Sequence, residues 1–333
     1  MPPEYGCAIT GWASALPPTV VTNRDIATLF ETNDEWIVER SGIRERRAAD
    51  GPFVNPGPPA SPPGGMGTTA QLAAEAGSGA LAKAGLTGAD IDLLILCTTS
   101  ADQLVPATSS PLAEALSIRG GAMDINAACA GFTYGLVTAA GFIASGIERV
   151  LLIGAETLTR ITDWSDRSNA FLFGDGAGAV VVEAVPGEPA LLGWDVGVDG
   201  SLQPLMLADH GGPGMSMRGQ EVFRKAVRVT VDSAVKSLER AKVGAADISV
   251  FVPHQANLRI MAAVAERLGI PSERVASVIE STGNTSSASI PIALCAAADE
   301  GRLGEGDLVL LAGFGAGMTW ASAVWRWGTG RAR

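Results

Sequence analysis

The chain has 333 residues, 47% of them hydrophobic, which is enough for a large core or for two halves of similar size. Its net charge of −11 argues against a general nucleic-acid binder, because such proteins carry a basic footprint. No apolar stretch of the sequence is long enough to cross a bilayer, so we expect no membrane span.

The cysteines and the N-terminal segment indicate the compartment. Four cysteines are scattered with no CxxC pair and no disulfide-framework spacing: Cys7, Cys97, Cys129 and Cys295. The segment MPPEYGCAIT lacks the basic and apolar regions of a signal peptide. We therefore expect a cytoplasmic protein with reduced thiols.

Residues 51–66, GPFVNPGPPASPPGGM, interrupt the regular pattern early in the chain. Their six prolines and four glycines exclude a helix or a central strand. A surface loop is the simplest interpretation, and a lid or a loop that contacts a partner is the alternative.

Two later segments indicate an internal duplication. Residues 81–96, LAKAGLTGADIDLLIL, and residues 238–253, LERAKVGAADISVFVP, align without a gap. Each predicts a helix end, a turn with Ala-Asp-Ile and an apolar strand. We predict a duplicated α/β fold with halves 1–184 and 185–333 and a site in the crevice between them. The alternative is the generic pattern that all α/β proteins share.

No motif indicates a cofactor or a metal. Both halves place a G-x-G-x-G turn before their closing strand, but neither turn fits the dinucleotide or P-loop patterns. Tight packing or close approach to a ligand is the simpler use of these glycines. We expect neither a metal site nor a redox cofactor.

Cys129 lies in DINAACAGF, between a strand-like run and a helix of small residues. The free N–H groups and the dipole at a helix start are expected to lower the pKa of its thiol and favour the nucleophilic thiolate. Taken alone, a cysteine among alanines is more often buried packing. Its interpretation therefore depends on partner residues.

Two candidate partners follow in the second half. His254 ends an apolar strand in VFVPHQANLRI, and the duplication would bring it to the same crevice as Cys129. Asn284, in IESTGNTSSASIPIAL, precedes another helix of small residues. Their structural alternatives are a hydrogen-bonded core histidine and a turn or N-cap asparagine. The only other histidine, His210, lies in a loop-like stretch and is expected at the surface.

Together, AACAGF, PHQANLRI and GNTSSASIP resemble the motifs of the β-ketoacyl-acyl-carrier-protein synthase III family of the thiolase superfamily. The resemblance runs from TNDEWIVERSGIRERR through TTSADQLVPATS and FGDGAGA to FGAGMTW, and the proline-rich segment departs from it as an insertion. It implies a thiolase-like, duplicated, five-layered αβαβα fold and a homodimer.

The resemblance also implies the chemistry. Cys129 would take the acyl group from an acyl-coenzyme A thioester, with the backbone N–H groups of Cys129 and Ala316 binding the oxyanion. His254 and Asn284, as neutral hydrogen-bond donors, would stabilise the enolate left when malonyl-acyl carrier protein loses carbon dioxide. The carbanion would then attack the acyl-cysteine. Coenzyme A is thus expected as part of a substrate, with no cofactor.

Coenzyme A contacts are implied at four positions. Trp36 resembles the residue that stacks on adenine, Arg160 the one on the other face, Arg40 a phosphate contact and Asn257 a contact to the pantetheine arm. For each of them alone, an ordinary helix-surface residue is the alternative.

An acidic carrier protein needs a local basic patch on an enzyme of net charge −11. RGQEVFRKAVR offers Arg224, Lys225 and Arg228, and the resemblance adds Arg259. A solvated charged face of a helix is the alternative.

The primer pocket departs from acetyl-using members. Val105 stands before Pro106 where such members often carry a phenylalanine, so a longer or branched primer is the hypothesis.

We therefore predict a condensing enzyme that starts fatty-acid or polyketide chains. The alternative within the fold is an acyltransferase of secondary metabolism, which moves the acyl group from Cys129 to a hydroxyl or amine. Asn284 favours carbon–carbon bond formation, because such branches often replace it. A catalytically silent protein that binds acyl carriers is the alternative of another class, and the intact catalytic set argues against it. Cys97 and Cys295 are interpreted as packing.

Overall fold

The computed structural model describes residues 5–49, 67–187, 189–209 and 214–328. The proline-rich segment 51–66 and His210 lie outside these residues, so what the sequence indicates for them stays a prediction.

The first half of the chain forms a five-stranded sheet with the order β1-β7-β6-β4-β5. Its strands are β1 (Tyr5–Ala15), β4 (Leu93–Cys97), β5 (Gly121–Ile125), β6 (Arg149–Thr157) and β7 (Asp175–Pro186). The strand β4 runs parallel to β5 and β6, and β7 is antiparallel to β6 and β1. All five residues of β4 are buried and apolar, as expected for a strand inside a parallel arrangement.

The second half repeats this sheet. Its strands are β8 (Leu191–Val198), β11 (Val250–Pro253), β12 (Leu308–Gly315) and β13 (Thr319–Arg326), in the order β11-β12-β13-β8. Read backwards, that is the order of the first four strands of the other sheet, with the same directions. The predicted duplication is therefore confirmed. The change from one sheet to the other falls between β7 and β8, next to the predicted boundary at 184 and 185.

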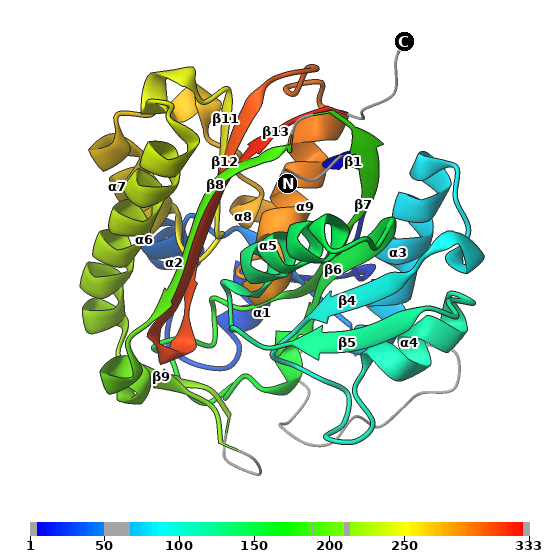
Figure 1. The fold of residues 1–333 in the computed structure, drawn as a ribbon. Helices are drawn as coiled ribbons and strands as arrows, with labels where there is room; N and C mark the ends of the chain where they lie inside the picture. Colours follow the sequence, from blue (N-terminus) through cyan, green and yellow to red (C-terminus); the bar gives the residue numbers. More distant parts are fainter. Residues whose placement is uncertain (1–4, 50–66, 188, 210–213, 329–333) are drawn as a thin grey trace.

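Helices complete five layers (Figure 1). Between the sheets lie α5 (Gly131–Ala144) and α9 (Ser289–Asp299), while α3 (Thr69–Ala84) and α4 (Ser109–Ala115) cover the outer face of the first sheet. The outer face of the second sheet is covered by α6 (Gly219–Ala241) and α7 (Leu258–Leu268). The αβαβα architecture predicted from the resemblance is thus confirmed.

The central helices are rich in small residues because they pack between two sheets. At Gly135 of α5, a side-chain Cβ would lie 2.6 Å from both the Cys97 sulfur and the Leu152 Cδ1 atom. Cys97 and Cys295 are fully buried in this packing. Both are core cysteines, as predicted.

Shorter elements lie in the connections between these strands and helices. They are β2 (Thr19–Thr22), α1 (Asn23–Ile26), α2 (Asp34–Ser41), β3 (Glu45–Ala48), β9 (Met206–Leu207), β10 (Ser216–Met217) and α8 (Ile279–Thr282). Single 3-10 turns are η1 (Gly88–Asp90), η2 (Leu158–Arg160), η3 (Gly200–Leu205), η4 (Ala245–Asp247), η5 (Ser272–Arg274), η6 (Ser286–Ala288) and η7 (Ala316–Met318).

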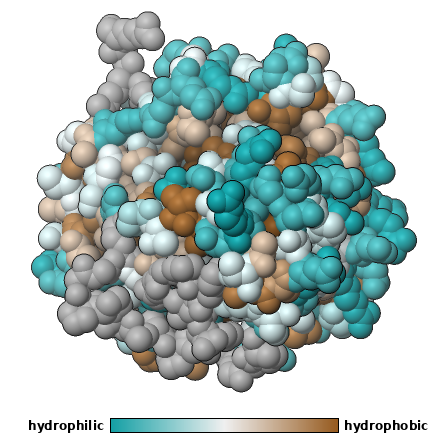
Figure 2. All heavy atoms as spheres, turned by 180° about the vertical axis from the view of Figure 1, so that it is seen from behind, coloured by the Kyte–Doolittle hydropathy of each residue, from teal (hydrophilic) through white to brown (hydrophobic). Residues whose placement is uncertain are grey.

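One face of the molecule is mostly polar. Figure 2 shows hydrophilic residues over most of the face opposite to that of Figure 1, with apolar residues in small separate spots. Within the described ranges, no helix combines the length and the apolar character that crossing a membrane requires.

Candidate active site

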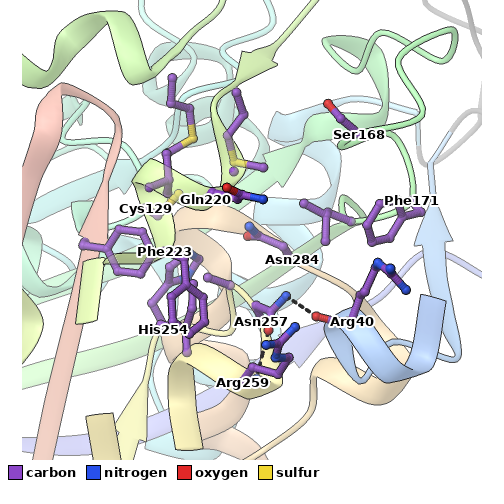
Figure 3. A pocket seen from close by; sticks show the side chains of 18 of the residues that line it. Arg40, Cys129, Ser168, Phe171, Gln220, Phe223, His254, Asn257, Arg259 and Asn284 are labelled. Atoms are coloured by element: carbon purple, nitrogen blue, oxygen red, sulfur yellow. Dashed lines mark hydrogen bonds between the residues drawn. The ribbon is translucent and has the colours of Figure 1, made fainter. Parts of the chain in front are cut away.

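A cavity of about 690 Å³ brings the three predicted catalytic residues together (Figure 3). Cys129 comes from the junction of β5 and α5, His254 from the end of β11, and Asn284 from the turn after α8. All three are buried at the inner end of the cavity, whereas the side chains of Arg40 and Arg259 are exposed at its outer end.

Cys129 is held at a tight turn before α5. The preceding Ala128 has a left-handed φ of +48°, and α5 begins at Gly131. Burial raises the pKa of the Cys129 thiol to about 12, an effect that contact with the Ser286 hydroxyl only partly opposes. The predicted lowering of this pKa by the helix start is therefore wrong. Desolvation of the thiolate outweighs the helix dipole at a side chain that is 9% exposed.

Three contacts hold His254 in place. Its backbone N–H donates to the carbonyl of Ala312 on β12, and its Nδ1 atom lies 2.7 Å from the Ser289 hydroxyl. The ring meets Phe314 edge-on at a centroid distance of 5.5 Å. Burial lowers the pKa of His254 to about 3, so the imidazole is neutral at physiological pH.

Asn284 presents its amide to the cavity in one orientation. Its Oδ1 atom accepts the backbone N–H of Ser286 at 2.8 Å, and its own backbone N–H donates to the Leu172 carbonyl. The preceding Gly283 has φ +63° and ψ −164°, a conformation essentially restricted to glycine. Because Oδ1 is occupied, the Nδ2 donor is the group left to serve the cavity.

The turn at Ala316 lies against the Cys129 turn. The Thr319 hydroxyl is within hydrogen-bond distance of two carbonyl oxygens, at 2.9 Å from Ala127 and 3.2 Å from Ala316. A Cβ at Gly315 would lie 2.5 Å from the Cys129 nitrogen, so only glycine fits there. The two peptides predicted as oxyanion donors are neighbours, and their role stays a prediction.

A second cavity, of about 350 Å³, also borders Cys129. The large apolar residues of its lining are Leu158, Ile161, Phe173, Met206, Leu207 and Met215, and polar residues that include Gln203 and Asp209 also border it. Cys129 thus stands between two spaces. Val105, predicted for the acyl pocket, lines neither of them and is 86% exposed in the single chain.

Trp36 on α2 is half-buried at the outer end of the large cavity, with two arginines over its ring. The guanidinium carbon of Arg40 lies 4.1 Å from the ring centroid and that of Arg167 lies 5.2 Å from it. Phe171 meets the same ring edge-on. Trp36 and Arg40 are placed together as predicted, and Arg167 is a neighbour that the sequence analysis missed.

Family models match both halves of the chain. The model described as 3-oxoacyl-[acyl-carrier-protein (ACP)] synthase III matches residues 123–200, and the model of the C terminal part of that synthase matches residues 238–327. A relative from Bacillus cereus, named beta-ketoacyl-[acyl-carrier-protein] synthase III 1, is 43% identical over 322 residues, which are 96% of this chain and 98% of the relative. The chain belongs to the synthase III family. The resemblance stated from the motifs is thereby confirmed.

Solved synthase III structures share the fold over the whole chain. The enzyme from Aquifex aeolicus VF5 is 41% identical with a TM-score of 0.90, covering 97% of this chain and 100% of that one. The priming β-ketosynthase from the R1128 polyketide biosynthetic pathway is 34% identical with a TM-score of 0.88, covering 98% of each chain.

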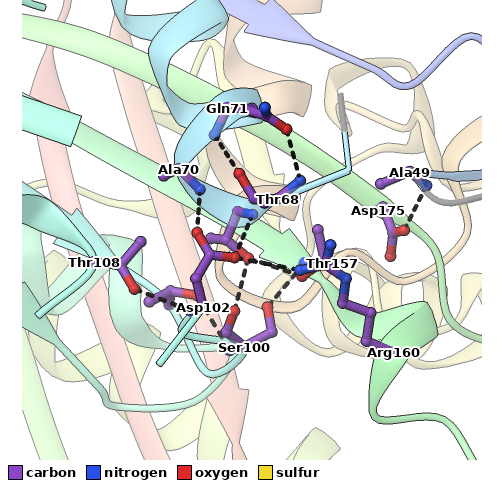
Figure 4. Close-up of polar contacts among 12 residues, drawn as sticks. Ala49, Thr68, Ala70, Gln71, Ser100, Asp102, Thr108, Thr157, Arg160 and Asp175 are labelled. Carbon is purple, nitrogen blue, oxygen red and sulfur yellow. Dashed lines mark hydrogen bonds and ion pairs between the residues drawn. The ribbon is translucent and has the colours of Figure 1, made fainter. Parts of the chain in front are cut away.

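Arg160 does not lie beside Trp36, contrary to the prediction. The Arg160 side chain is buried, and its Nη1 atom forms an ion pair with Asp102 at 3.3 Å (Figure 4). Asp102 in turn accepts the backbone N–H groups of Thr69 and Ala70 at the start of α3. The prediction is wrong because this ion pair holds Arg160 inside the first half, outside the cavity that Trp36 lines.

Asn257 links the two sides of the cavity. It caps α7 by accepting the backbone N–H of Arg259, and its Nδ2 atom donates to the carbonyl of Arg40 at 2.7 Å. Asn257 lines the cavity, and the predicted contact to pantetheine stays a prediction.

The four predicted carrier-docking residues divide into two groups. Arg224 and Arg259 line the outer end of the cavity. Lys225 and Arg228 are exposed on α6 and lie outside the cavity, and Arg228 forms an i,i+4 ion pair with Asp232. All four lie on α6 and α7, the outer layer of the second half.

Glu156, a fully buried carboxylate at the end of β6, was not predicted from the sequence. It accepts the Ser100 hydroxyl at 2.5 Å from the first half and the Ser287 hydroxyl at 2.7 Å from the second. Glu156 thus joins the loop after β4 to η6, beside Asn284. No signal marks it in the sequence beyond an acidic residue that ends an apolar strand.

Within the described residues, no three His, Cys, Asp or Glu side chains are grouped as a metal site requires.

Proposed function

We propose that this protein is a chain-starting condensing enzyme that joins an acyl group from acyl-coenzyme A to malonyl-acyl carrier protein. One observation carries the proposal. A buried cysteine, a neutral histidine and an asparagine with a free amide donor line one cavity that opens to the surface beside basic residues. This is the set that acyl transfer followed by decarboxylation requires.

In the acylation step, the Cys129 sulfur attacks the thioester carbonyl of acyl-coenzyme A. The bond from that carbon to the coenzyme A sulfur breaks, and the thiol proton of Cys129 leaves on the coenzyme A thiol. Negative charge develops on the carbonyl oxygen, where we propose the N–H groups of Cys129 and Ala316 as donors.

In the condensation step, the bond between the malonyl carboxylate and the α-carbon breaks and carbon dioxide leaves. The electron pair of the broken bond stays on the α-carbon and forms a thioester enolate. We propose that His254 and Asn284 donate hydrogen bonds to the enolate oxygen. The α-carbon then attacks the acyl-cysteine carbonyl and expels the Cys129 sulfur, which takes a proton from the solvent. The neutral state of His254 suits a donor role, because an imidazolium would transfer its proton to the enolate.

Coenzyme A is proposed to enter by the large cavity as part of a substrate, with no further cofactor. Its adenine would stack on Trp36 with Arg167 in the role first given to Arg160. Arg40 would bind phosphate and Asn257 the pantetheine arm, since both line the cavity.

The second cavity is proposed to take the primer chain. A methylene group occupies about as much space as a water molecule, roughly 30 Å³. A cavity of about 350 Å³ with large apolar residues in its lining therefore exceeds the need of an acetyl group. This supports a longer or branched primer.

A homodimer is proposed because apolar side chains, Val105 among them, are exposed near an edge strand. Leu104 and Val105 are 78% and 86% exposed, and β5 is an edge strand of its sheet. A second copy packed along β5 would cover these apolar side chains and bring Val105 to the primer pocket of its partner. Cytoplasmic localisation is proposed because the reaction needs a free thiol at Cys129.

The four basic residues on α6 and α7 are proposed to dock the acidic carrier protein. The outward positions of Lys225 and Arg228 give a positive rim, and Arg224 and Arg259 lead from it to the cavity.

The test follows the mass of the intact protein with a panel of acyl-coenzyme A donors, before and after malonyl-acyl carrier protein is added. We expect an acyl adduct on Cys129 that disappears as a β-ketoacyl carrier and carbon dioxide form, fastest with donors longer than acetyl. An adduct that persists with malonyl carrier, and clears only with a hydroxyl or amine acceptor, would establish the acyltransferase instead.

A further inference from the structure

The Nδ1 atom of the His254 ring has one hydrogen-bond partner among the described residues. Nδ1 lies 2.7 Å from the hydroxyl of Ser289, the first residue of α9. His254 is 3% exposed and Ser289 is fully buried, so bulk water does not compete for this contact. With Nδ1 held there, Nε2 is the ring nitrogen left to face the cavity that His254 shares with Cys129.

The Ser289 hydroxyl has two partners among the described residues. Its oxygen accepts the backbone N–H of Gln255 at 3.2 Å. Its other contact is Nδ1 of His254. A hydroxyl has one proton to donate, and a backbone N–H cannot accept it. The proton of Ser289 is therefore directed at Nδ1.

From this accounting we infer that Ser289 is a positioning residue that holds His254 in the tautomer with its proton on Nε2. A ring nitrogen that accepts a hydrogen bond carries no proton, so a neutral imidazole must carry it on the other nitrogen. The Nε2–H group then points into the cavity as a donor. Without Ser289, the proton could sit on Nδ1, and Nε2 would present a lone pair to the substrate.

The fold supports this arrangement at two further points. The N-terminal end of α9, an eleven-residue helix, begins at Ser289, and its partial positive charge disfavours a second proton on the neighbouring ring. The Phe314 ring and the Ala312 carbonyl fix the ring plane and the backbone of His254 from β12. With the backbone and the ring plane held in this way, turning the ring over would move Nδ1 away from Ser289 and break their hydrogen bond.

The consequence for the reaction rests on the proposed function. An enolate oxygen needs hydrogen-bond donors, and a lone pair at Nε2 would repel it. Ser289 would thus act on the decarboxylation step and leave the attack of Cys129 on acyl-coenzyme A unaffected.

The decisive experiment reads the tautomer directly. The chain has only two histidines, so a sample with ¹⁵N-labelled histidine rings gives two sets of signals, and a His210→Gln variant assigns them. In the wild-type protein at pH 7, we expect His254 with a protonated Nε2 and an unprotonated Nδ1. A wild-type His254 with its proton on Nδ1 overturns the inference, whatever the enzyme activity.

Variants then connect the tautomer to the rate. Ser289→Ala is expected to shift the ring toward the Nδ1–H form and to slow condensation about tenfold, the effect of one lost buried hydrogen bond. Its rate of Cys129 acylation should stay at the wild-type value. Ser289→Thr keeps a hydroxyl and is expected to keep the wild-type tautomer. The matched control is Ser237→Ala, a buried serine that bonds to Ser322 on the far side of the second sheet.

The outcomes separate this inference from the proposed function. A wild-type protein that never forms a β-ketoacyl carrier defeats the proposed function, while the tautomer measurement still stands. A Ser289→Ala variant that folds and keeps both the Nε2–H tautomer and the condensation rate defeats the role of Ser289.

Discussion

Arg167 lies over the indole ring of Trp36, with its guanidinium carbon 5.2 Å from the ring centroid. A base inserted beside Trp36 would gain stacking and cation–π attraction from such a pair. Arg167→Ala is therefore expected to raise the KM for acyl-coenzyme A about tenfold and to leave kcat nearly unchanged. Steady-state kinetics measure this, with Arg119→Ala as the control, because Arg119 is exposed and lies outside the cavity. An unchanged KM would exclude Arg167 from the coenzyme A site.

The raised pKa of Cys129 predicts how the free enzyme reacts with iodoacetamide. With a pKa of about 12, the thiolate fraction is small at pH 7 and grows about tenfold with each pH unit. We expect the alkylation rate of Cys129 to rise in this way from pH 7 to 9 with no plateau, as followed by intact-protein mass. Cys129→Ser shows how much modification falls on the other three cysteines. A plateau below pH 8 would mean that the helix start lowers the pKa after all.

The sequence alone was sufficient for the duplication and for the three residues in the cavity. A gapless repeat indicates that the two halves share a topology. Cys129, His254 and Asn284 each lie within a motif at the end of a strand or in a turn. It was not sufficient to choose between Arg160 and Arg167, which fall in one short stretch. The ion pair that holds Arg160 away from Trp36 joins it to Asp102, a residue distant in the sequence. The sequence also did not show that the pKa of Cys129 is raised. Burial is a property of the assembled layers, and it outweighs the local helix.

Glu156 lines neither cavity, and we expect it to contribute to stability. Its carboxylate accepts hydroxyl and backbone groups from the two halves, Ser100 and Ser287 among them. Glu156→Gln replaces one acceptor oxygen by an NH₂ group that faces donors, and a buried donor without a partner costs about 1–3 kcal/mol. We expect the free energy of unfolding, measured with guanidinium chloride, to fall by about that amount.

The control for Glu156 is Glu114→Gln. Glu114 forms an exposed ion pair with Arg119, and such pairs contribute about 0–1 kcal/mol. Equal losses in the two variants would show that the buried hydrogen bonds of Glu156 stabilise the fold no more than an exposed ion pair does.

The basic rim on α6 predicts a selective effect on the carrier substrate. Lys225 and Arg228 are exposed and lie outside the coenzyme A cavity. Reversing both charges, in Lys225→Glu with Arg228→Glu, is expected to raise the KM for malonyl-acyl carrier protein about tenfold at low salt. The KM for acyl-coenzyme A should stay unchanged. Arg119→Glu is the control for a charge reversal elsewhere on the surface. A double variant with wild-type KM for the carrier would move the docking surface elsewhere.

Burial of His254 predicts a loss of stability in mild acid. Its pKa falls from an ordinary value of 6.5 to about 3 in the folded chain, so below pH 6.5 the unfolded state binds a proton that the folded state excludes. Unfolding is therefore favoured as the pH falls. Between pH 7 and 5 this amounts to about 2 kcal/mol, at 1.36 kcal/mol for each pH unit below 6.5.

The measurement compares the wild-type protein with His254→Gln by denaturant unfolding at pH 7 and pH 5. Both chains share His210 and all carboxylates, so the difference between their two losses isolates His254. We expect the wild-type protein to lose about 2 kcal/mol more than the variant over this range. Equal losses would mean that His254 takes up its proton in the folded state near pH 6.5. Below that pH a charged imidazolium would then face the substrate, which is incompatible with a neutral donor to an enolate.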